Sequence, residues 1–453
     1  MPSVPTLNHP LIPSDELDKL NALAKTALAQ AKSLGCDASA VNLYAQQGVS
    51  VNARLGEIET LEYHSDRGLS VTVYRNQAKG SASTGDLRSD SISDCVSRAA
   101  DIARFTQADE FSGLPDKQDL ATEFPDLDLW HQQDISIDEV IERAKAVEAA
   151  GLDYDARIVN SEGGSFSASQ GVSLLANSDG FSGRRWKTSY SQSCSFIGED
   201  GQGMQRDYWY DSKHAMADMD SVKVTGETAA RRTIARLGAK SIKTGTMPII
   251  FSAEVAAGII GHFVTAVSGG SLYRNASFLK DRINTAVFPQ AISLYEQPQL
   301  VGAAASASFD SEGVATSDRE IIARGVLDSY LLGSYAGRKL GMRTSGHASG
   351  VHNLKLEAAA ITTDKLLVEM GDGLLVTEVM GQGVNIVTGD YSRGAAGFLI
   401  RNGEIVHAVD EVTIAASLED IFMNLIGVGT DVDERGKIHT PSILIREMMV
   451  AGD

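Results

Sequence analysis

Cysteine is scarce in this 453-residue chain, which contains only Cys36, Cys95 and Cys194 and no Cys-x-x-Cys pair. Three scattered cysteines exclude a disulfide framework and are typical of a protein from a reducing compartment. No stretch approaches the roughly 18 uninterrupted apolar residues of a membrane-spanning helix. The N-terminal sequence, MPSVPTLNHPLIPSDEL, lacks the basic residues and the long apolar core of a secretory signal. We therefore expect a cytoplasmic protein without membrane contact.

Basic residues are also few, because 40 Lys and Arg stand against 59 Asp and Glu and give a formal net charge of −19. Nucleic acids and anionic membranes bind to clustered Lys and Arg, so neither is expected as a direct partner. The remaining composition, 43% hydrophobic and 22% charged, is ordinary for a globular protein. The length allows two or three domains, each with a substantial core.

The first half of the chain shows one order of elements twice. Apolar spacing predicts a helix, an antiparallel meander and a helix, at residues 15–34, then 40–45, 48–62 and 68–75, then 89–105. A linker without periodicity follows near 106–134. The same order then recurs, with a helix from the capping box Ser136–Glu139 to 150, strands at 156–160, 165–168, 171–177, 183–197 and 207–210, and a helix at 221–237.

Glycine-rich strands and turns dominate from residue 246 onward. The strands expected there lie at 303–308, 354–360, 374–379, 397–401, 404–409 and 442–447, with a short helix at 417–424. We therefore predict an α+β protein with two domains. Residues 1–237 form an N-terminal α/β domain of helix-plus-meander units, with a break near 106–134, and residues 238–453 form a β-rich C-terminal domain that contains a central helix.

That central helix follows a short apolar strand, Pro248–Phe251. Ser252 is a suitable N-cap, and Ala253–Val267 carries apolar residues at helical spacing without proline. Gly269 and Gly270 are expected to end the helix. In α/β enzymes, catalytic groups are often found where a strand leads into a helix of this kind.

The helix carries one acid, Glu254, and one imidazole, His262. Eight residues of helix separate them by roughly 12 Å, whereas zinc bonds to nitrogen or oxygen are about 2.0–2.2 Å long. One metal ion cannot bind both side chains.

Two more histidines, His347 and His352, lie in the loop GRKLGMRTSGHASGVHNL, which starts at Gly337. A loop pair can bind metal, but no Cys or acid stands beside these two at metal-binding spacing. The alternative is a structural role in which the imidazoles bind loop carbonyl groups.

The segment TDVDERG contains Asp431 and Asp433 at the spacing of a calcium loop. The fifth position is Arg435 and the twelfth is Ser442, where such a loop needs an acid or amide and a Glu. The match therefore fails.

Residues 374–405, LLVTEVMGQGVNIVTGDYSRGAAGFLIRNGEI, read as strands joined by glycine turns and closed by an Asn402-Gly403 hairpin. Small residues in strands allow a second backbone to approach, as when an extended peptide is added to a sheet. Alternatively, the glycines only turn corners. The candidates for peptide docking in this segment are Gly381, Gly383, Gly389 and Asp390.

The central helix, the loop at 337–354 and residues 374–405 together resemble the PmbA/TldD family, in particular its PmbA (TldE) branch. In the TldD branch, the corresponding helix carries a His-Glu pair and a second His one turn on, which bind zinc. Here Ala253 precedes Glu254, and Ala257 and Gly258 stand one turn on. A Cys near the C-terminus completes the TldD site, and the matching stretch NLIGVGTDVDERG has none. The resemblance thus implies no cofactor in this chain and zinc in a partner subunit.

The resemblance also implies a cytosolic complex with a TldD-type chain that cleaves unfolded peptides. Family members are associated with peptide-antibiotic maturation, antitoxin turnover and modulation of gyrase inhibition. Two hypotheses remain open. In the first, which the missing ligands favour, this chain is the non-catalytic partner. In the second, it is a metallopeptidase in its own right, with Glu254 as general base and His262, His347 or His352 as metal ligands. Whether the chain also pairs with itself stays open.

Overall fold

The computed structural model describes residues 11–453. Most of the N-terminal sequence MPSVPTLNHPLIPSDEL, in which no secretory signal is expected, lies outside the described residues. The chain forms two compact units. The first contains the residues up to Gly198 together with Arg206–Thr233 and Ser308–Thr316, and the second contains Glu199–Gln205, Ile234–Ala307 and Ser317–Asp453. None of the described helices is both long and apolar enough to span a membrane.

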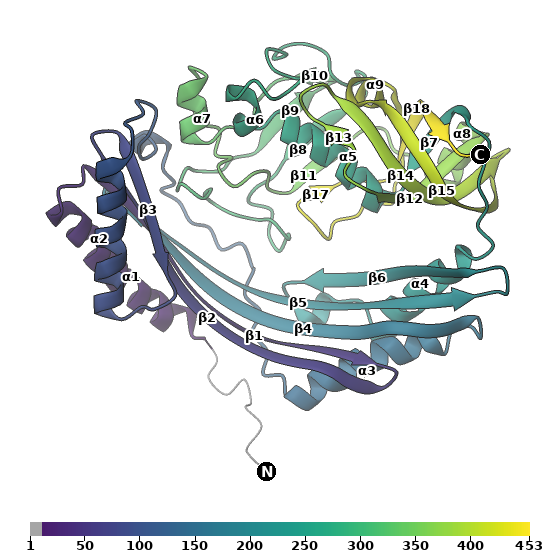
Figure 1. Cartoon of the computed structure of the whole chain (residues 1–453), viewed down its shortest axis with the longest axis horizontal. Coiled ribbons are helices and arrows are strands. Elements are labelled where there is room, and N and C mark those ends of the chain that lie inside the picture. The colour runs from purple at the N-terminus through teal and green to yellow at the C-terminus, as the bar shows by residue number, and fades with distance from the viewer. Residues whose placement is uncertain (1–10) are drawn as a thin grey trace. The chain divides into compact units, whose positions relative to one another are not determined.

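The first unit is built on one six-stranded sheet with the order β3-β2-β1-β4-β5-β6 (Figure 1). Its strands are β1 (Ala38–Arg54), β2 (Glu57–Arg75), β3 (Ala78–Thr84), β4 (Ile158–Asn177), β5 (Ser182–Glu199) and β6 (Met204–Lys213). Its helices are α1 (Pro13–Ser33), α2 (Ser89–Phe105), α3 (Ile137–Leu152) and α4 (Val222–Ala235), with short 3-10 turns at Lys117–Asp119 and Met216–Asp218.

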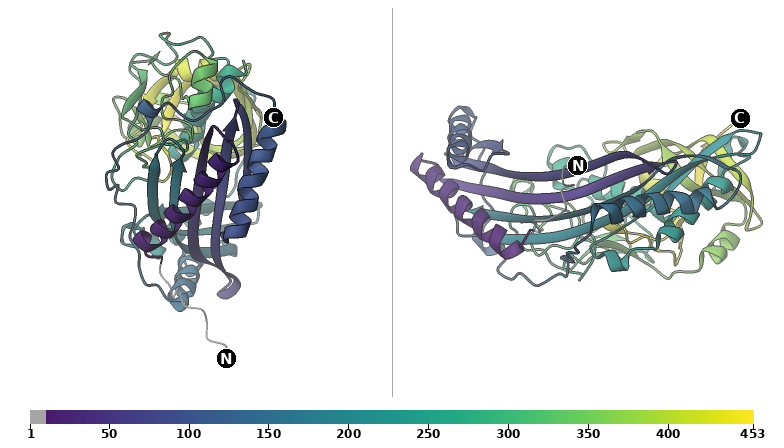
Figure 2. Two further views of the ribbon diagram at one scale, coloured as in Figure 1. Left: turned by 90° about the vertical axis from the view of Figure 1, so that its left-hand side faces the viewer. Right: turned by 90° about the horizontal axis from the view of Figure 1, so that it is seen from below.

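The order helix, three strands, helix occurs twice, and the two copies meet along the antiparallel pair β1–β4. In the view from below, α1 and α3 lie across the same sheet toward its opposite ends (Figure 2, right). Two separate hydrophobic clusters fill the space between helices and sheet. One joins α1 and α2 to residues such as Leu43 and Leu174, and the other joins α3 to residues such as Val49 and Phe166. The capping box of Ser136 and Glu139 at the start of α3 is present.

Strands β1 and β2 are continuous at positions where the sequence predicts turns. Breaks expected at Gly48 and Gly68 are wrong, because β1 and β2 continue past both and turn instead at Leu55-Gly56, where φ is positive. A Cβ at Gly48 would lie 2.5 Å from the His64 ring, and one at Gly68 would lie 2.7 Å from the Tyr44 ring. These glycines make room for rings that lie across the strand, so they do not form turns.

The same error affects the second meander, because β4 is one continuous strand where three were expected. Gly164 lies against helix α3, and a Cβ there would be 2.4 Å from the carbonyl oxygen of Ala144. This glycine therefore permits close packing of helix on sheet.

A short segment of the C-terminal half, Ser308–Thr316, belongs to the first unit. The Arg185 guanidinium of β5 lies 3.9 Å from the centre of the Phe309 ring, and the Phe181 ring meets Phe309 edge-on at 5.3 Å. The strand expected at 303–308 is wrong, since this stretch forms turns. Its Ala and Ser side chains bury too little apolar surface to fix a strand.

The second unit contains two sheets. The larger has the order β12-β7-β18-β15-β14-β13, and the additional pair β12–β14 closes five of these strands into a ring. The smaller has the order β10-β9-β8-β11-β17. The strands are β7 (Gly245–Phe251), β8 (Ser293–Glu296), β9 (Arg319–Ala323), β10 (Val326–Leu327), β11 (Leu354–Glu357), β12 (Gly373–Met380), β13 (Val384–Asn385), β14 (Asp390–Arg401), β15 (Glu404–Ser417), β16 (Leu425–Val428), β17 (Ile438–His439) and β18 (Ile443–Ala451).

Helix α5 (Ala253–Ala266) follows β7, as the sequence predicts. Its apolar side, which includes Ile259 and Phe263, shares one core cluster with Leu294 of the smaller sheet and Ile443 of the larger. The other helices of this unit are α6 (Gly269–Tyr273), α7 (Ser334–Lys339), α8 (Thr363–Met370) and α9 (Leu418–Met423). Gly269 was expected to end α5, but α5 ends at Ala266 and Gly269 begins α6. A Cβ at Gly269 would lie 2.4 Å from the Ala336 Cβ, so the glycine makes room for α7.

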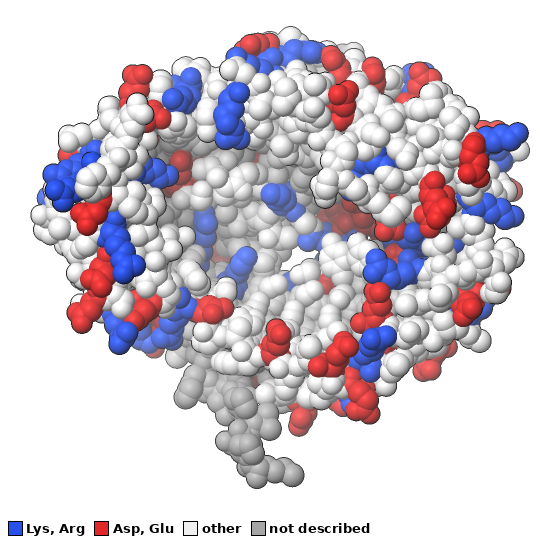
Figure 3. Space-filling model, viewed as in Figure 1, with Lys and Arg blue, Asp and Glu red and all other residues white. Residues whose placement is uncertain are grey.

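The predicted α+β class, with helix-plus-meander units followed by a β-rich part around a central helix, is confirmed. On the face shown in Figure 3, Lys and Arg residues are interspersed with Asp and Glu and form no extended basic patch.

Candidate functional site

The start of α5 is fixed by the strand before it. Ser252 donates its backbone N–H to the carbonyl oxygen of Val376 in β12, at 3.0 Å. Ser252 occupies the N-cap position, as expected, but its hydroxyl makes no capping bond. Instead it donates to Oε2 of Glu254, at 3.1 Å. These two hydrogen bonds hold the first turn of α5 against β12 and hold the Glu254 carboxylate beside Ser252.

One side of α5 is not covered by the core. Glu254, Gly258, Gly261 and Thr265 lie along it at helical spacing, and both Gly258 and Thr265 are exposed. A Cβ at Gly258 would meet no atom within 4 Å, and one at Gly261 would meet only a methyl carbon of Ile438, at 3.9 Å. Packing within the second unit thus does not require either glycine.

Glu254 forms an ion pair with Arg435. Nη2 of Arg435 lies 3.7 Å from Oε1 of Glu254, and the two side chains are 11% and 28% exposed. The same guanidinium donates two hydrogen bonds of 2.9 Å to the Asp433 carboxylate. Burial raises the pKa of Asp433, but the hydrogen bonds from Arg435 outweigh it and keep that pKa below its ordinary value. Arg435 therefore places a permanent positive charge between two acids.

The loop that carries Arg435 is held against α5. Thr440 donates its hydroxyl to the carbonyl oxygen of Ala253 at 3.2 Å, and the Asp431 carboxylate accepts from the backbone N–H and hydroxyl of Ser442 at 3.0 and 2.6 Å. Both acids of the apparent calcium loop thus have partners inside the chain. His439 in β17 is buried, which lowers its pKa, and its Nε2 lies 3.0 Å from the Gly436 carbonyl oxygen.

The donor atoms on α5 do not suit a metal. Ala253, Ala257 and Gly258, which the family resemblance aligns with zinc ligands or their neighbours, have no side-chain atom that can bind a cation. Among residues 11–453, no group of three or more His, Cys, Asp or Glu side chains is arranged to hold a metal ion. Glu254 instead lies beside the cationic guanidinium of Arg435.

His262 lies on α5 away from Glu254. Its ring meets the Tyr391 ring of β14 edge-on with 5.9 Å between centres, and its Nε2 is buried without a partner among the described residues. Burial, and secondarily Arg393, lowers the pKa of His262. Burial also raises the pKa of Tyr391 to about 12. His262 therefore lies beside the Tyr391 ring and near the positive charge of Arg393, and not beside an acid.

His347 and His352 meet at Glu296, the last residue of β8. Glu296 is fully buried, with His347 Nε2 and the backbone N–H of His352 at its two oxygens, and Nδ1 of His347 lies 2.8 Å from the Ser345 hydroxyl. Burial raises the pKa of Glu296, but the histidine hydrogen bonds reverse this and bring it to about 2. The expected loop-carbonyl partners are wrong, since a carboxylate 51 residues from His347 in sequence binds both residues.

The glycines proposed for peptide docking lie around the β13–β14 hairpin. A Cβ at Gly383 would lie 1.9 Å from the Ser392 carbonyl oxygen, and Gly389 has a positive φ of 84°. Gly381 also has a positive φ, of 81°, and a Cβ there would meet no atom within 4 Å. Asp390 is exposed and accepts from Thr388. The chain's own hairpin accounts for Gly383 and Gly389, so peptide docking there stays a prediction.

Sequence comparison covers most of the chain. Profiles of the PmbA/TldA metallopeptidase family match residues 40–103 as domain 1, residues 130–237 as the central domain and residues 244–452 as the C-terminal domain. The chain belongs to the PmbA/TldD family. Metalloprotease PmbA of Escherichia coli O157:H7 is 45% identical over 425 residues, 94% of each chain. A metalloprotease PmbA homolog of Haemophilus influenzae is 46% identical over 90% of each chain. The resemblance to the PmbA branch is confirmed.

Solved structures of PmbA/TldD relatives share the fold. A candidate modulator of DNA gyrase from Bacteroides thetaiotaomicron superposes with a TM-score of 0.91 at 29% identity, over 96% of this chain and 99% of that one. TldE from Thermococcus kodakarensis gives a TM-score of 0.83 at 18% identity, over 95% and 100%. The predicted fold is thus that of the family.

The sequence did not reveal three contacts of this site. In the sequence, Arg435 is only the residue at which the match to a calcium loop fails, and its pairing with Glu254 joins residues 181 positions apart (435 − 254). Glu296 ends a four-residue strand with no motif around it. Tyr391 lies inside a segment whose sequence signals are its glycines. The sequence offers one signal for the first of these contacts. Arg435 is a charged residue in the stretch NLIGVGTDVDERG, where the TldD branch has its Cys ligand.

Proposed function

We propose that this chain is the non-catalytic subunit of a cytoplasmic two-chain metallopeptidase that cleaves unfolded peptides. The observation that carries this is the ion pair between Glu254 and Arg435. At the helix start where the TldD branch carries its His-Glu pair, this chain presents an acid that is already bound by a cation, beside three residues without donor atoms. In such a complex, the zinc and the general base come from a TldD-type partner.

The side of α5 that the core leaves uncovered is a candidate contact surface for another chain. Glycine inside a helix costs roughly 0.5–1 kcal/mol relative to alanine. Two glycines, Gly258 and Gly261, accept this cost although no contact within the second unit requires them. We infer that an approaching backbone, from the partner subunit or from the bound peptide, requires the missing side chains. The gyrase-related and metalloprotease names of the relatives fit a role in regulated proteolysis.

The alternative is a metallopeptidase that uses Glu254 with its own histidines. The names of the relatives favour it, since they are called metalloproteases. The geometry does not support it, because the His347 ring is hydrogen-bonded to Glu296, Nδ1 of the His352 ring lies 3.5 Å from the same carboxylate, and His262 lies against Tyr391.

The experiment that decides between them mixes this chain with a TldD-type chain from the same organism. The proposal predicts co-elution in size-exclusion chromatography at micromolar concentration, and cleavage of an unfolded peptide only by the mixture. Separate elution, or equal cleavage by the TldD-type chain alone, would disprove the partner role.

A further inference from the structure

Strand β2 is paired on both sides along only part of its length. β3 pairs with Leu69–Arg75 of β2, so residues 57–67 have β1 on one side and form an open edge of the sheet (Figure 1). Among the described residues, the backbone of 57–67 makes hydrogen bonds to β1 alone, and every second residue directs its N–H and C=O groups outward. All of these residues except His64 are exposed.

The opposite edge of the same sheet is protected by its own side chains. In β6, the carboxylates of Asp207 and Asp211 accept the backbone N–H groups of Tyr208 and Ser212, each at 2.8 Å. Donors that are satisfied in this way are not available to an added strand. No side chain in the described part of the chain makes such a contact with the backbone of residues 57–67. The two edges therefore differ, and only the β2 edge is open to pairing.

An apolar strip of the sheet continues onto this open edge. The residues of β1 that are buried under α3 are Val49, Val51 and Ala53. The residues opposite them on β2 are Tyr63, Leu61 and Ile58, which lie on the same face and are 46, 45 and 44% exposed. Three large apolar side chains at an exposed edge are what protected edges avoid, and they mark a surface that another chain can cover.

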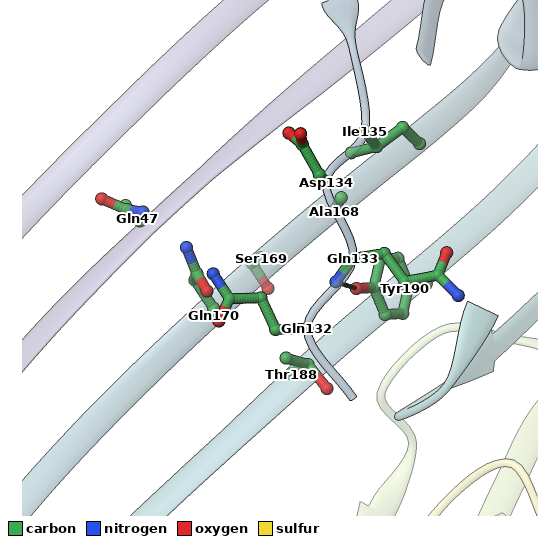
Figure 4. A pocket seen from close by; sticks show the side chains of 10 residues that line it. All are labelled: Gln47, Gln132, Gln133, Asp134, Ile135, Ala168, Ser169, Gln170, Thr188 and Tyr190. Carbon is green, nitrogen blue, oxygen red and sulfur yellow. Dashed lines mark hydrogen bonds between the residues drawn. The ribbon is translucent and has the colours of Figure 1, made fainter. Parts of the chain in front are cut away.

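The strip has a defined end. In the next row, Gln47 of β1 lies opposite Ser65 of β2. Gln47 also lines a pocket of about 380 Å³ over the middle of the sheet, together with polar side chains such as Gln170 (Figure 4). The exposed apolar side chains are thus confined to residues 58–63, where the neighbouring β1 residues belong to the core under α3.

The same stretch of β2 is strongly acidic. Residues 57–66 contain no Lys or Arg and four acids, namely Glu57, Glu59, Glu62 and Asp66. Glu62 and Asp66 lie opposite Ser50 and Gln46, on the face of the sheet away from α3. Neither acid forms an ion pair within residues 11–453. A strand added at this edge therefore meets apolar side chains on one face and carboxylates on the other.

We propose that residues 57–67 bind an extended segment of another protein in which basic and apolar residues alternate. The outward N–H and C=O groups of β2 pair with the backbone of the segment, as in other cases of strand addition. Successive side chains of a strand point to opposite faces, so the apolar residues of the segment lie beside Leu61 and Tyr63 while its Lys or Arg residues lie beside Glu62.

A second copy of β2 is a poorer occupant, because it brings four more acids to a strip that has no cation. All residues of the open edge belong to the first unit, and the test uses this chain alone. The inference is therefore independent of the metallopeptidase proposal.

Fluorescence anisotropy of labelled peptides mixed with the full chain measures binding. The probe is the heptapeptide Lys-Val-Lys-Val-Lys-Val-Lys, and we expect it to bind. The heptapeptide Lys-Pro-Lys-Pro-Lys-Pro-Lys has the same charge but cannot form a ladder of backbone hydrogen bonds, and it should not bind. The heptapeptide Glu-Val-Glu-Val-Glu-Val-Glu keeps the strand pattern with the opposite charge and should not bind either.

Charge reversal on the chain gives the matched test. Glu62→Lys should weaken binding of the Lys-Val peptide at least about tenfold, which corresponds to roughly 1.4 kcal/mol, and should allow the Glu-Val peptide to bind. Leu61→Ser should also weaken binding of the Lys-Val peptide, because it removes the apolar contact. Asp94→Lys, at an exposed position on α2, changes the net charge by the same amount and should leave binding unchanged.

Amide hydrogen exchange locates the bound peptide. We expect the Lys-Val peptide to slow exchange in residues 57–67 and to leave β6 unchanged. The proposal is overturned if the Lys-Val peptide does not bind, if the Lys-Pro peptide binds equally well, or if Glu62→Lys has no effect. Protection outside β2 also overturns it. So does a wild-type dimer that dissociates on Leu61→Lys, since that result assigns the edge to a second copy of this chain.

Discussion

Oε1 of Glu254 lies 3.7 Å from the guanidinium of Arg435, and the same guanidinium holds Asp433 through two hydrogen bonds. The relationship joins the first turn of α5 to the loop after β16, which are the two places where the resemblance to the TldD branch expects zinc ligands. A fixed cation therefore stands beside the retained acid. The predictions below follow from this arrangement and from the surroundings of α5.

Arg435→Gln should lower the free energy of unfolding by about 2 kcal/mol at pH 7, the scale of hydrogen bonds to a charged group. The pKa of Asp433 is lowered from 3.8 in the folded chain, chiefly by Arg435 acting against burial. A lowered folded pKa stabilises the fold above the unfolded pKa, and the stabilisation is lost as pH falls through the folded pKa. The difference between variant and wild type should therefore shrink below about pH 4.

Urea unfolding at a series of pH values measures this difference. Arg446→Gln, at an exposed position on β18, is the matched control and should change the free energy of unfolding by less than about 0.5 kcal/mol. A deficit for Arg435→Gln that stays constant down to the lowest pH at which the wild type is folded would contradict the assigned role of Arg435.

Gly258→Ala should stabilise the isolated chain by roughly 0.5–1 kcal/mol, because alanine favours the helix and the added Cβ meets no atom within the chain. The same change should weaken association with a TldD-type chain. Gly269→Ala is the control in the opposite direction, since its Cβ would lie 2.4 Å from that of Ala336. Thermal unfolding and size-exclusion chromatography measure the two effects. A less stable Gly258→Ala chain would show that the glycine is needed for folding.

His347→Ala should lower the free energy of unfolding by about 3 kcal/mol or more, because it leaves the buried carboxylate of Glu296 without a main partner. The pKa of Glu296 is lowered from 4.5 to about 2, so this stabilisation is present above pH 4.5 and is lost only as pH approaches about 2. Adding a chelator to the wild type should leave the unfolding midpoint unchanged. A midpoint that drops with chelator would mean that a metal holds this cluster.

Metal content tests the donor set of α5 directly. We expect the isolated chain to retain less than one zinc per chain after dialysis and to show no chelator-sensitive peptidase activity. The reason is that Ala253, Ala257 and Gly258 offer no ligand atoms. One zinc per chain that resists dialysis and is lost in His262→Ala would support the alternative, in which this chain is itself the metallopeptidase.

The sequence predicted α1 to α5 and α9, but not the short helices α6, α7 and α8 or the strand β3. Apolar periodicity and capping residues are local signals, and they placed α2 and the start of α3 at their observed positions. The breaks in β1 and β4 were wrong because Gly48 and Gly164 face a ring and a helix that are distant in sequence. A glycine that makes room for a neighbour has the same local sequence as one that makes a turn.

The candidate site was predictable only in what it lacks. The absence of His and Cys from the zinc positions can be read from the sequence once the family resemblance is seen. The pairing of Arg435 with Glu254, and of Glu296 with His347, depends on contacts between segments far apart in the chain. No spacing rule connects such residues, so only the folded structure shows what replaces the missing ligands.

The most direct measurement of the central claim is the peptide-cleavage rate of the two-chain complex assembled with Glu254→Gln. If this chain is the non-catalytic partner, the rate stays at the wild-type value, while the same change at the helix Glu of the TldD-type chain lowers it by about 10²-fold or more, the scale of a general base. If Glu254→Gln in this chain lowers the rate by that factor and the complex still forms, Glu254 is a catalytic residue and the account is contradicted.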